Sequence, residues 1–332
     1  MIDDVFQIRS DADFKQKCLE TFLYQYKNVE VYRKFVDYLK TDLSSVNTIK
    51  DIPFLPIEIY KNHQVLDENS ETDLFFQSSG TTESNRSKHW IADEEIYKQS
   101  ILTSFQKFIG EPDEFVILGL LPNYSENPHS SLIYMVDYLM KESGQIENDY
   151  FLYNYLKLYS LLKKLKTKEK KIILFGVSFA LLDFLDTLNK ENLTIENPDL
   201  MLIETGGMKG RKEEMTKDEL LQIFQKGFGS EQIFSEYSMT ELLSQAYSLG
   251  ENLYQTPSWM KIMIRNTEDP FQFLPCGKTG AINIIDLANI HTCSFIATQD
   301  LGKIEIQNNE EYFSVLGRID HSDIRGCSLL IN

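Results

Sequence analysis

Apolar side chains recur at helical spacing through the first forty residues of the chain. They stand three or four positions apart, as in Phe14, Cys18, Leu19, Phe22 and Leu23. This spacing predicts two amphipathic helices over residues 11–40, with a break near Asn28. The proline-containing segment 52–57 is expected to be extended, because proline restricts the backbone of its neighbours. Residues 1–74 are therefore expected to form an N-terminal helical segment packed on the core.

Between residues 75 and 258, short apolar runs alternate with longer amphipathic stretches. The apolar runs predict buried strands at residues 115–121, 171–176, 199–204 and 232–234. The amphipathic stretches predict helices at residues 93–109, 131–140, 179–188 and 212–228. This alternation is typical of an α/β fold with a largely parallel, doubly wound sheet. The basic run 163–171 is expected to be a solvated connector within this core, which spans residues 75–258.

From Trp259 onward, the predicted elements are closely spaced β segments. They lie at residues 259–264, 280–286, 293–298, 303–306 and 312–315. This change of pattern predicts a smaller β subdomain over residues 259–316, followed by a short tail over residues 317–332.

The composition is that of a globular chain with a strong acidic bias. Hydrophobic residues make up 42% of the sequence and charged residues 25%. The formal net charge of −17 argues against a nucleic acid or an anionic membrane surface as the main partner. ATP remains compatible with this charge, because a local cationic pocket and Mg²⁺ can offset the global field. The sequence has no apolar run of about 18 residues and no apolar leader, so we expect a cytoplasmic protein without a membrane span.

The four cysteines lie far apart, without the CxxC spacing of a zinc site. They are Cys18, Cys276, Cys293 and Cys327. This arrangement gives neither a zinc signature nor a disulfide framework.

A hydroxyl-rich stretch follows the apolar pair Phe75-Phe76. It contains Ser78, Ser79, Gly80, Thr81 and Thr82. Glycine allows a close approach of the backbone to a ligand, and hydroxyl and N–H groups in such a turn bind anionic oxygens. Arg86 and Lys88 follow within reach and can supply positive charge. The stretch does not match GxxxxGK[ST] or GxGxxG, and taken alone it is equally compatible with a polar surface loop.

Polar groups also follow two predicted strands of the parallel sheet, where ligands bind in open α/β sheets. Gly206-Gly207 comes after the strand at residues 199–204 and is either a site of close approach to a base or an acyl carbonyl, or a simple turn. The segment from Ser238 to Glu241 follows the next strand. Its Ser-x-x-Glu spacing also fits a helix capping box.

Two further segments carry groups suited to a nucleotide. Asp300 has a carboxylate that can accept two hydrogen bonds from a vicinal diol, although taken alone this segment favours a β-turn residue in a hairpin. Arg318 lies in Gly317-Arg318-Ile319-Asp320, near the end of the chain.

Taken in order, these segments resemble the conserved elements of the adenylate-forming superfamily, which includes acyl-CoA synthetases, peptide-synthetase adenylation domains and firefly-type luciferases. Ser78–Thr82 resembles the phosphate loop, and Tyr237–Glu241 resembles Tyr-Gly-x-Thr-Glu. Ala297–Gly302 resembles Thr-Gly-Asp-Leu-Gly, and the segment around Arg318 resembles the Gly-Arg-x-Asp hinge. The hydroxyl-rich loop followed by Lys88-His89 is similar to that of acyl-protein synthetases, the fatty-acid-activating components of bacterial bioluminescence.

The resemblance implies a role for each matching residue. Tyr237 is expected against the adenine, Thr240 at the α-phosphate, and Glu241 on Mg²⁺. Asp300 is expected to hold the ribose hydroxyls and Arg318 the ribose or a phosphate. Asp320 would mark the pivot of a mobile C-terminal domain. The Arg-Gly-Cys at residues 325–327 matches the family's C-terminal cysteine, so Cys327 is the expected acyl acceptor.

The sequence departs from the superfamily pattern at several points. The loop continues with Glu83 in place of the usual Gly-x-Pro-Lys, and Ser238 and Gln299 each replace a glycine. The chain ends at Asn332, so the usual C-terminal domain and its catalytic lysine are expected to be missing.

We therefore predict an ATP- and Mg²⁺-dependent ligase that activates a carboxylic acid, in particular a fatty acid, as an acyl-adenylate. The acyl group would then move to Cys327, and a reductase or transferase is the expected protein partner. One alternative is an enzyme that transfers the acyl group to coenzyme A, carrier-protein pantetheine or a carbohydrate. Another is a nucleotide-binding scaffold subunit without turnover.

Overall fold

The computed structural model describes residues 5–79, 86–122, 127–168, 170–206 and 215–319. Within these residues, one 12-stranded sheet runs through the molecule in the order β11-β12-β13-β14-β10-β9-β8-β7-β6-β4-β5. Strand β1 (Leu55–Pro56) joins it by pairing with β13 (Phe295–Gln307). No helix of the described residues combines the length and apolar character needed to cross a membrane.

One half of the sheet is parallel. Its strands are β5 (Asp149–Tyr150), β4 (Phe115–Leu120), β6 (Lys171–Val177), β7 (Leu200–Thr205) and β8 (Ile233–Tyr237). Alternate residues of these strands belong to two separate apolar cores. Strands buried on both faces read as continuous apolar runs, which is why the sequence revealed them. The predicted α/β class is confirmed in this half.

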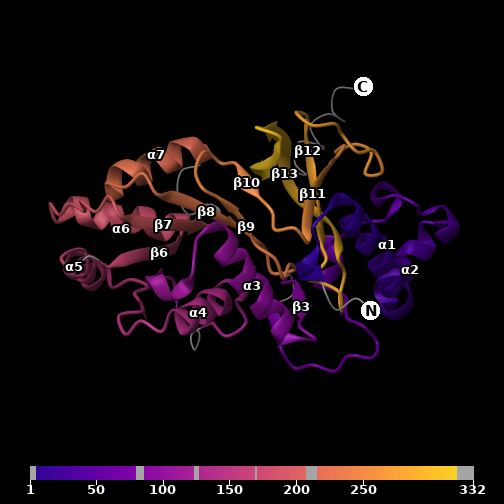
Figure 1. Cartoon of the computed structure of the whole chain (residues 1–332), viewed down its shortest axis with the longest axis horizontal. Helices are drawn as coiled ribbons and strands as arrows, with labels where there is room; N and C mark the ends of the chain where they lie inside the picture. The colour runs from indigo at the N-terminus through magenta and orange to yellow at the C-terminus, as the bar shows by residue number, and fades with distance from the viewer. Residues whose placement is uncertain (1–4, 80–85, 123–126, 169, 207–214, 320–332) are drawn as a thin grey trace, which may run out of the picture.

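Helices cover both faces of the parallel half. One apolar core includes α5 (Tyr155–Lys166), α6 (Ser178–Lys190) and α7 (Lys217–Phe228). The other includes α3 (Glu94–Phe108) and α4 (Ser131–Ser143). Figure 1 shows α6 and α7 on one side of the strands and α3 and α4 on the other.

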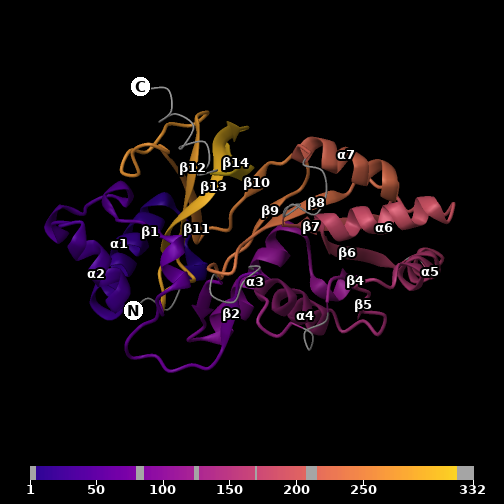
Figure 2. The ribbon, with the colours of Figure 1, turned by 180° about the vertical axis from the view of Figure 1, so that it is seen from behind.

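The other half of the sheet is antiparallel. Its strands are β9 (Ala246–Ser248), β10 (Tyr254–Gln255), β14 (Glu310–Arg318), β13, β12 (Thr279–Asp286) and β11 (Met260–Arg265). The N-terminal helices α1 (Asp11–Asn28) and α2 (Glu30–Tyr38) lie beside this half, as Figure 2 shows from behind. Since β8 pairs with β9 and β10 with β14, the two halves are continuous through backbone hydrogen bonds. The domain boundaries predicted at residues 74, 258 and 316 stay predictions.

The sequence predictions differ from the structure at several places. The first part of the basic run is not a connector, because Lys163–Lys166 form the last turn of α5, whose apolar face packs on the sheet. The two β segments predicted at 293–298 and 303–306 are one strand, β13. A short hairpin of β2 (Phe75–Gln77) and β3 (Lys88–Trp90) was not predicted, and it holds the two ends of the hydroxyl-rich stretch together.

Candidate active site

Three of the predicted nucleotide-binding residues form one connected cluster where the two halves of the sheet meet. The Tyr237 hydroxyl donates a hydrogen bond to Asp300 Oδ2 over 2.9 Å. On the other side, the Arg318 guanidinium Nε lies 3.5 Å from Asp300 Oδ1. The Asp300 side chain is 17% exposed and that of Arg318 70%, so the cluster opens to solvent on the side of the guanidinium.

Strand pairing brings these residues together from distant parts of the chain. Asp300 on β13 is directly opposite Arg318 on β14. Tyr237 is the last residue of β8, and its ring packs edge-on against Tyr254 and Phe313. The interpretation of Asp300 as a β-turn residue is therefore wrong, because it lies inside a strand.

The surroundings of Asp300 set its protonation. Burial raises the pKa of the Asp300 carboxyl, while the Tyr237 hydroxyl and the Arg318 charge oppose this rise. Burial also raises the pKa of the Tyr237 phenol well above its ordinary value, and the Asp300 charge adds to the effect. The phenol therefore stays protonated and acts as the donor to Asp300.

Glu241 lies in the turn that follows β8, and its carboxyl group is almost completely buried. Burial is the main cause that raises the Glu241 pKa. The Ser87 hydroxyl and the charge of Arg318 lower it, and the charge of Asp300 raises it. Among the described residues, no lysine, arginine or histidine forms an ion pair with Glu241, and no three His, Cys, Asp or Glu side chains gather to hold a metal ion. A buried carboxylate without a cation is suited to bind one that arrives with a ligand.

The capping-box interpretation of Ser238 and Glu241 is wrong. No helix begins at these residues, because the chain passes through a short turn from β8 to β9. The turn is closed by a hydrogen bond from Leu242 N to Met239 O of 3.0 Å. The Asn289 side chain donates to the Glu241 carbonyl over 2.8 Å, which fixes the turn from the antiparallel half.

His89 connects this turn to the hydroxyl-rich stretch, and the sequence analysis did not predict it. Its Nδ1 lies 2.9 Å from the Thr240 carbonyl and its Nε2 3.1 Å from Thr292 Oγ1. A carbonyl only accepts, so Nδ1 carries the proton and Nε2 accepts from the Thr292 hydroxyl. The alternation of β3, in which Lys88 is exposed and His89 buried, is the signal that could have revealed it.

The described ends of the hydroxyl-rich stretch are hydrogen-bonded to each other. Ser78 N donates to Ser87 O over 3.1 Å, and Ser87 N donates to Ser78 Oγ over 3.0 Å. Ser79 and Arg86 lie just inside this closure. Three predicted phosphate-binding residues, Gly80, Thr81 and Thr82, lie outside the described residues. Ser87, at one described end of the stretch, is among the groups that lower the Glu241 pKa, so this end lies near the Glu241 turn.

Lys88, which was predicted to supply positive charge to the site, lies beside an aromatic ring. Its amino group lies over the ring of Phe75, 5.0 Å from the ring centre. His129 stacks on the same ring at 4.1 Å. Within the described residues, Lys88 forms no hydrogen bond or ion pair with Tyr237, Asp300 or Arg318, so its predicted catalytic role stays a prediction.

Gly206 ends β7 in a turn that only glycine adopts readily, with φ of +73°. Its carbonyl accepts a hydrogen bond of 2.9 Å from the Ser178 hydroxyl, which also lies 2.7 Å from Glu204 Oε2. Glu204 is fully buried and forms an ion pair with Lys217, the first residue of α7. These polar groups fix the carboxyl ends of β6 and β7. Gly207 lies outside the described residues.

Asp286 is a second buried residue that the sequence analysis missed. Its carboxylate accepts hydrogen bonds from the backbone N–H groups of Leu243, Ser244 and Ala288, and from the Ser244 hydroxyl. Burial raises the Asp286 pKa to about 6, although these bonds oppose the rise. Asp286 thereby ties the chain that follows Glu241 to the loop after β12.

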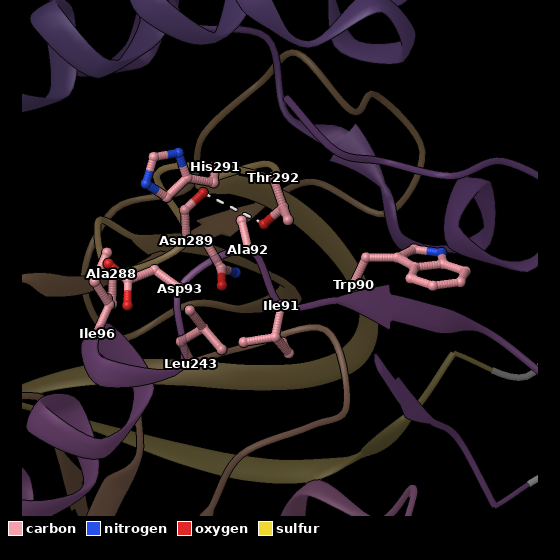
Figure 3. Close-up of a pocket in the computed structure, with 10 residues that line it drawn as sticks. All are labelled: Trp90, Ile91, Ala92, Asp93, Ile96, Leu243, Ala288, Asn289, His291 and Thr292. Carbon is pink, nitrogen blue, oxygen red and sulfur yellow. Dashed lines mark hydrogen bonds between the residues drawn. The ribbon is translucent and has the colours of Figure 1, made fainter. Parts of the chain in front are cut away.

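Figure 3 shows a small cavity beside this loop. Its volume is about 10 Å³, enough for about one water molecule. It is lined by Trp90, Ile91, Ala92, Asp93, Ile96, Leu243, Ala288, Asn289, His291 and Thr292. The cavity is therefore part of the packing behind the Glu241 turn.

The predicted acyl acceptor Cys327, like Asp320, lies outside the described residues. Of the other cysteines, Cys18 and Cys293 are buried, and burial raises the pKa of each thiol to about 12. Only Cys276 is an exposed thiol among the described residues. Buried thiols of this kind are poor nucleophiles.

Several solved structures have a fold similar to that of this chain. An open 2-hydroxyisobutyryl-CoA ligase in complex with 2-HIB-AMP and CoA has a TM-score of 0.70 at 12% identity, covering 96% of this chain and 74% of its own. ATP-bound MatB from Rhodopseudomonas palustris has a TM-score of 0.54 at 16% identity. The match covers 74% of this chain and 47% of that chain. A long-chain-fatty-acid-CoA ligase from Archaeoglobus fulgidus has a TM-score of 0.53 at 16% identity. The match covers 78% of this chain and 53% of that chain. At these identities they define the fold, and the predicted fold class is confirmed.

Within this fold class, the chain belongs to the family described as acyl-protein synthetase, LuxE, which matches residues 7–332. The long-chain-fatty-acid–luciferin-component ligase of Aliivibrio fischeri is 22% identical over 334 residues, which cover 93% of this chain and 85% of that protein. The family and the ligase class predicted from the sequence motifs are confirmed.

Proposed function

We propose that the protein uses ATP to activate a fatty acid as its acyl-adenylate and then transfers the acyl group to a cysteine thiol. The observation that carries this proposal is the cluster of Tyr237, Asp300 and Arg318, which three separate strands bring together. The cluster opens to solvent on the side of Arg318, and its carboxylate and guanidinium suit the hydroxyl and phosphate groups of a nucleotide.

The residues of the site have complementary tasks toward ATP. Asp300 would accept hydrogen bonds from both ribose hydroxyls, and Tyr237 would hold its carboxylate in place. Glu241 would hold Mg²⁺ shared with the phosphates, since it is a buried carboxylate beside the hydroxyl-rich loop. Bound Mg²⁺ neutralises charge on the phosphates. Loop residues 78–82, with Arg86 or Lys88, would position the phosphates for in-line attack.

In the first step, a carboxylate oxygen of the acid attacks the α-phosphorus of ATP. An acyl–phosphate bond forms, the bond between the α-phosphorus and the bridging oxygen breaks, and pyrophosphate leaves. In the second step, the Cys327 thiolate attacks the acyl carbonyl, and AMP leaves with the bonding electrons. A reductase or transferase would then receive the acyl group from the thioester.

The first prediction tests the nucleotide site through pyrophosphate release with a panel of carboxylic acids. Asp300→Ala should raise the KM for ATP by roughly 10- to 100-fold, because charge-assisted hydrogen bonds of about 1.5–3 kcal/mol are lost. Glu241→Gln should lower kcat by orders of magnitude, with little change in melting temperature.

Glu231→Gln is the matched control, because Glu231 is exposed just before β8. Normal kinetics in Asp300→Ala would show that the ribose assignment is wrong. A wild-type protein that binds ATP and releases no pyrophosphate with any acid would favour the scaffold alternative.

The second prediction concerns the acyl acceptor. Incubation with ATP, Mg²⁺ and labelled fatty acid should place a hydroxylamine-sensitive label on the denatured chain. Cys327→Ser should lose this label and still release pyrophosphate, whereas Cys276→Ser, which changes an exposed thiol, should keep it. A label that persists in Cys327→Ser would exclude this acceptor. Pyrophosphate release that becomes catalytic only with added coenzyme A would favour the ligase alternative.

A further inference from the structure

Gln299 stands where the adenylate-forming pattern has glycine, and its side chain makes two contacts that glycine cannot make. Its amide nitrogen donates a hydrogen bond to Glu58 Oε1. Its amide oxygen accepts one of 3.1 Å from the Arg318 guanidinium Nη2. Gln299 therefore connects Glu58, in the N-terminal part of the chain, with the guanidinium beside Asp300.

The backbone around Gln299 is built to hold this connection. Strand β1 runs parallel to β13, with Leu55 opposite Ile296 and Pro56 opposite Ala297. Glu58 lies two residues beyond this pairing, in the 3-10 turn Ile57–Lys61, and this brings it close to Gln299. The contact between the two side chains thus follows from strand pairing.

Backbone hydrogen bonds fix both sides of Asp300 as well. The Gln299 carbonyl accepts from Ile319 N over 2.8 Å, and Asp300 N donates to Thr298 Oγ1 over 3.1 Å. Arg265 in turn donates to the Thr298 carbonyl over 2.6 Å. The strand segment that carries Gln299 and Asp300 is therefore held on both sides.

Arg318 needs such a support because its side chain is 70% exposed. A long exposed side chain loses rotamer freedom when it is held in one position, and a single exposed ion pair seldom compensates for that loss. Two acceptors, Asp300 Oδ1 and Gln299 Oε1, hold the guanidinium fork from the same strand. The Glu58 carboxylate polarises the Gln299 amide and makes its oxygen a better acceptor.

We propose that Gln299, held by Glu58, is a positioning residue that keeps Arg318 against Asp300 and thereby sets the preference of the site for ribose over 2′-deoxyribose. The inference rests on the proposed function, because it takes Asp300 and Arg318 as the ribose-binding pair. The N-terminal part of the chain then contributes to nucleotide selection without contact with the nucleotide.

The test compares the calorimetric Kd values of ATP and 2′-deoxyATP in the full-length protein with Mg²⁺. The wild type should bind ATP at least tenfold more tightly. Gln299→Ala should weaken ATP binding roughly fivefold to tenfold and 2′-deoxyATP binding less than twofold. Glu58→Ala should act in the same direction, and the double variant should be no worse than Gln299→Ala alone, since both remove one connection.

Two further variants separate positioning from general damage. Gln307→Ala, an exposed glutamine at the end of β13, is the matched control and should change neither Kd. Gln299→Glu keeps an acceptor for Arg318 and places a negative charge against Glu58. It should therefore retain more of the ATP preference when combined with Glu58→Gln than when introduced alone.

Each outcome bears on a distinct claim. Equal losses for both nucleotides in Gln299→Ala, strictly additive effects of the two substitutions, or a wild type that binds both nucleotides equally would overturn the inference. Absence of ATP binding would overturn both the inference and the proposed function. If the predicted Kd pattern appears without pyrophosphate release, the proposed reaction fails and the assignment of Gln299 stands.

Discussion

A single buried imidazole links three parts of the site. His89 is fully buried, its Nδ1 faces the Thr240 carbonyl and its Nε2 faces the Thr292 hydroxyl. Burial lowers the His89 pKa to about 4, against a smaller opposing effect of the Thr240 carbonyl. The ring is therefore neutral near pH 7, with Nδ1 donating to the Thr240 carbonyl and Nε2 accepting from the Thr292 hydroxyl.

The third prediction follows from this pKa. The pKa of His89 is about 4 in the folded state and 6.5 in the unfolded state, so the unfolded state binds an extra proton between these values. The stability that neutral His89 provides is complete above pH 6.5 and is lost as the pH falls toward 4, by on the order of 3 kcal/mol. Urea unfolding of the wild type and of His89→Gln should reveal this as a difference that shrinks in acid. His63→Gln, which changes an exposed histidine, should show no such trend.

At the scale of elements, the ends of β6 and β7 depend on buried polar groups. Ser178 at the start of α6 holds the Gly206 carbonyl, and Glu204 is placed between Ser178 and Lys217. Burial lowers the Lys217 pKa to about 7, while the nearby Glu236 charge raises it. Among the described residues, this network ties the first residue of α7 to the ends of β6 and β7, beside the apolar contacts of the helix.

The fourth prediction is that Lys217→Met is strongly destabilising. It leaves the Glu204 carboxylate buried without its cation, a loss that typically costs about 3–5 kcal/mol. The double variant Glu204→Leu/Lys217→Met should recover part of this loss, because no unpaired charge remains. Urea unfolding at pH 6, below the Lys217 pKa of about 7 so that the ammonium is charged, measures both. Lys226→Met, on the exposed face of the same helix, is the control. Equal stability of Lys217→Met and Lys226→Met would refute the network.

Much of this architecture could be predicted because local patterns encode it. The apolar runs of β4, β6 and β7 and the amphipathic stretch of α3 were predicted within a few residues of their bounds. The α5 helix was missed because its lysines concealed the spacing of Leu158, Leu162 and Leu165. His89, Asp286 and Gln299 contact residues far away in the chain, and no local pattern contains that information.

At the scale of the whole molecule, the N-terminal helices and the antiparallel half share buried hydrogen bonds. Gln25 of α1 is fully buried. Its amide nitrogen donates to the carbonyls of Asn289 and Ile290 over 2.9 and 3.0 Å, and its oxygen accepts from Ser294 N over 3.0 Å. Because Asn289 also holds the Glu241 carbonyl, α1 supports the candidate active site through this loop.

The fifth prediction is that the N-terminal helices unfold together with the sheet. Gln25→Leu keeps the size of the side chain and leaves buried carbonyl and N–H groups unpaired, at about 1–3 kcal/mol for each. The free energy of unfolding should therefore fall by about 3 kcal/mol or more. Trp259, which is buried at the junction and packs edge-on against Phe6 at 4.7 Å, should report the same midpoint by fluorescence as the helices do by far-UV circular dichroism.

Gln16→Leu is the control, because Gln16 lies on the exposed face of α1. Two separate transitions in Gln25→Leu would instead mean that residues 1–74 fold as an independent unit. The N-terminal helices would then not stabilise the loop that holds Glu241.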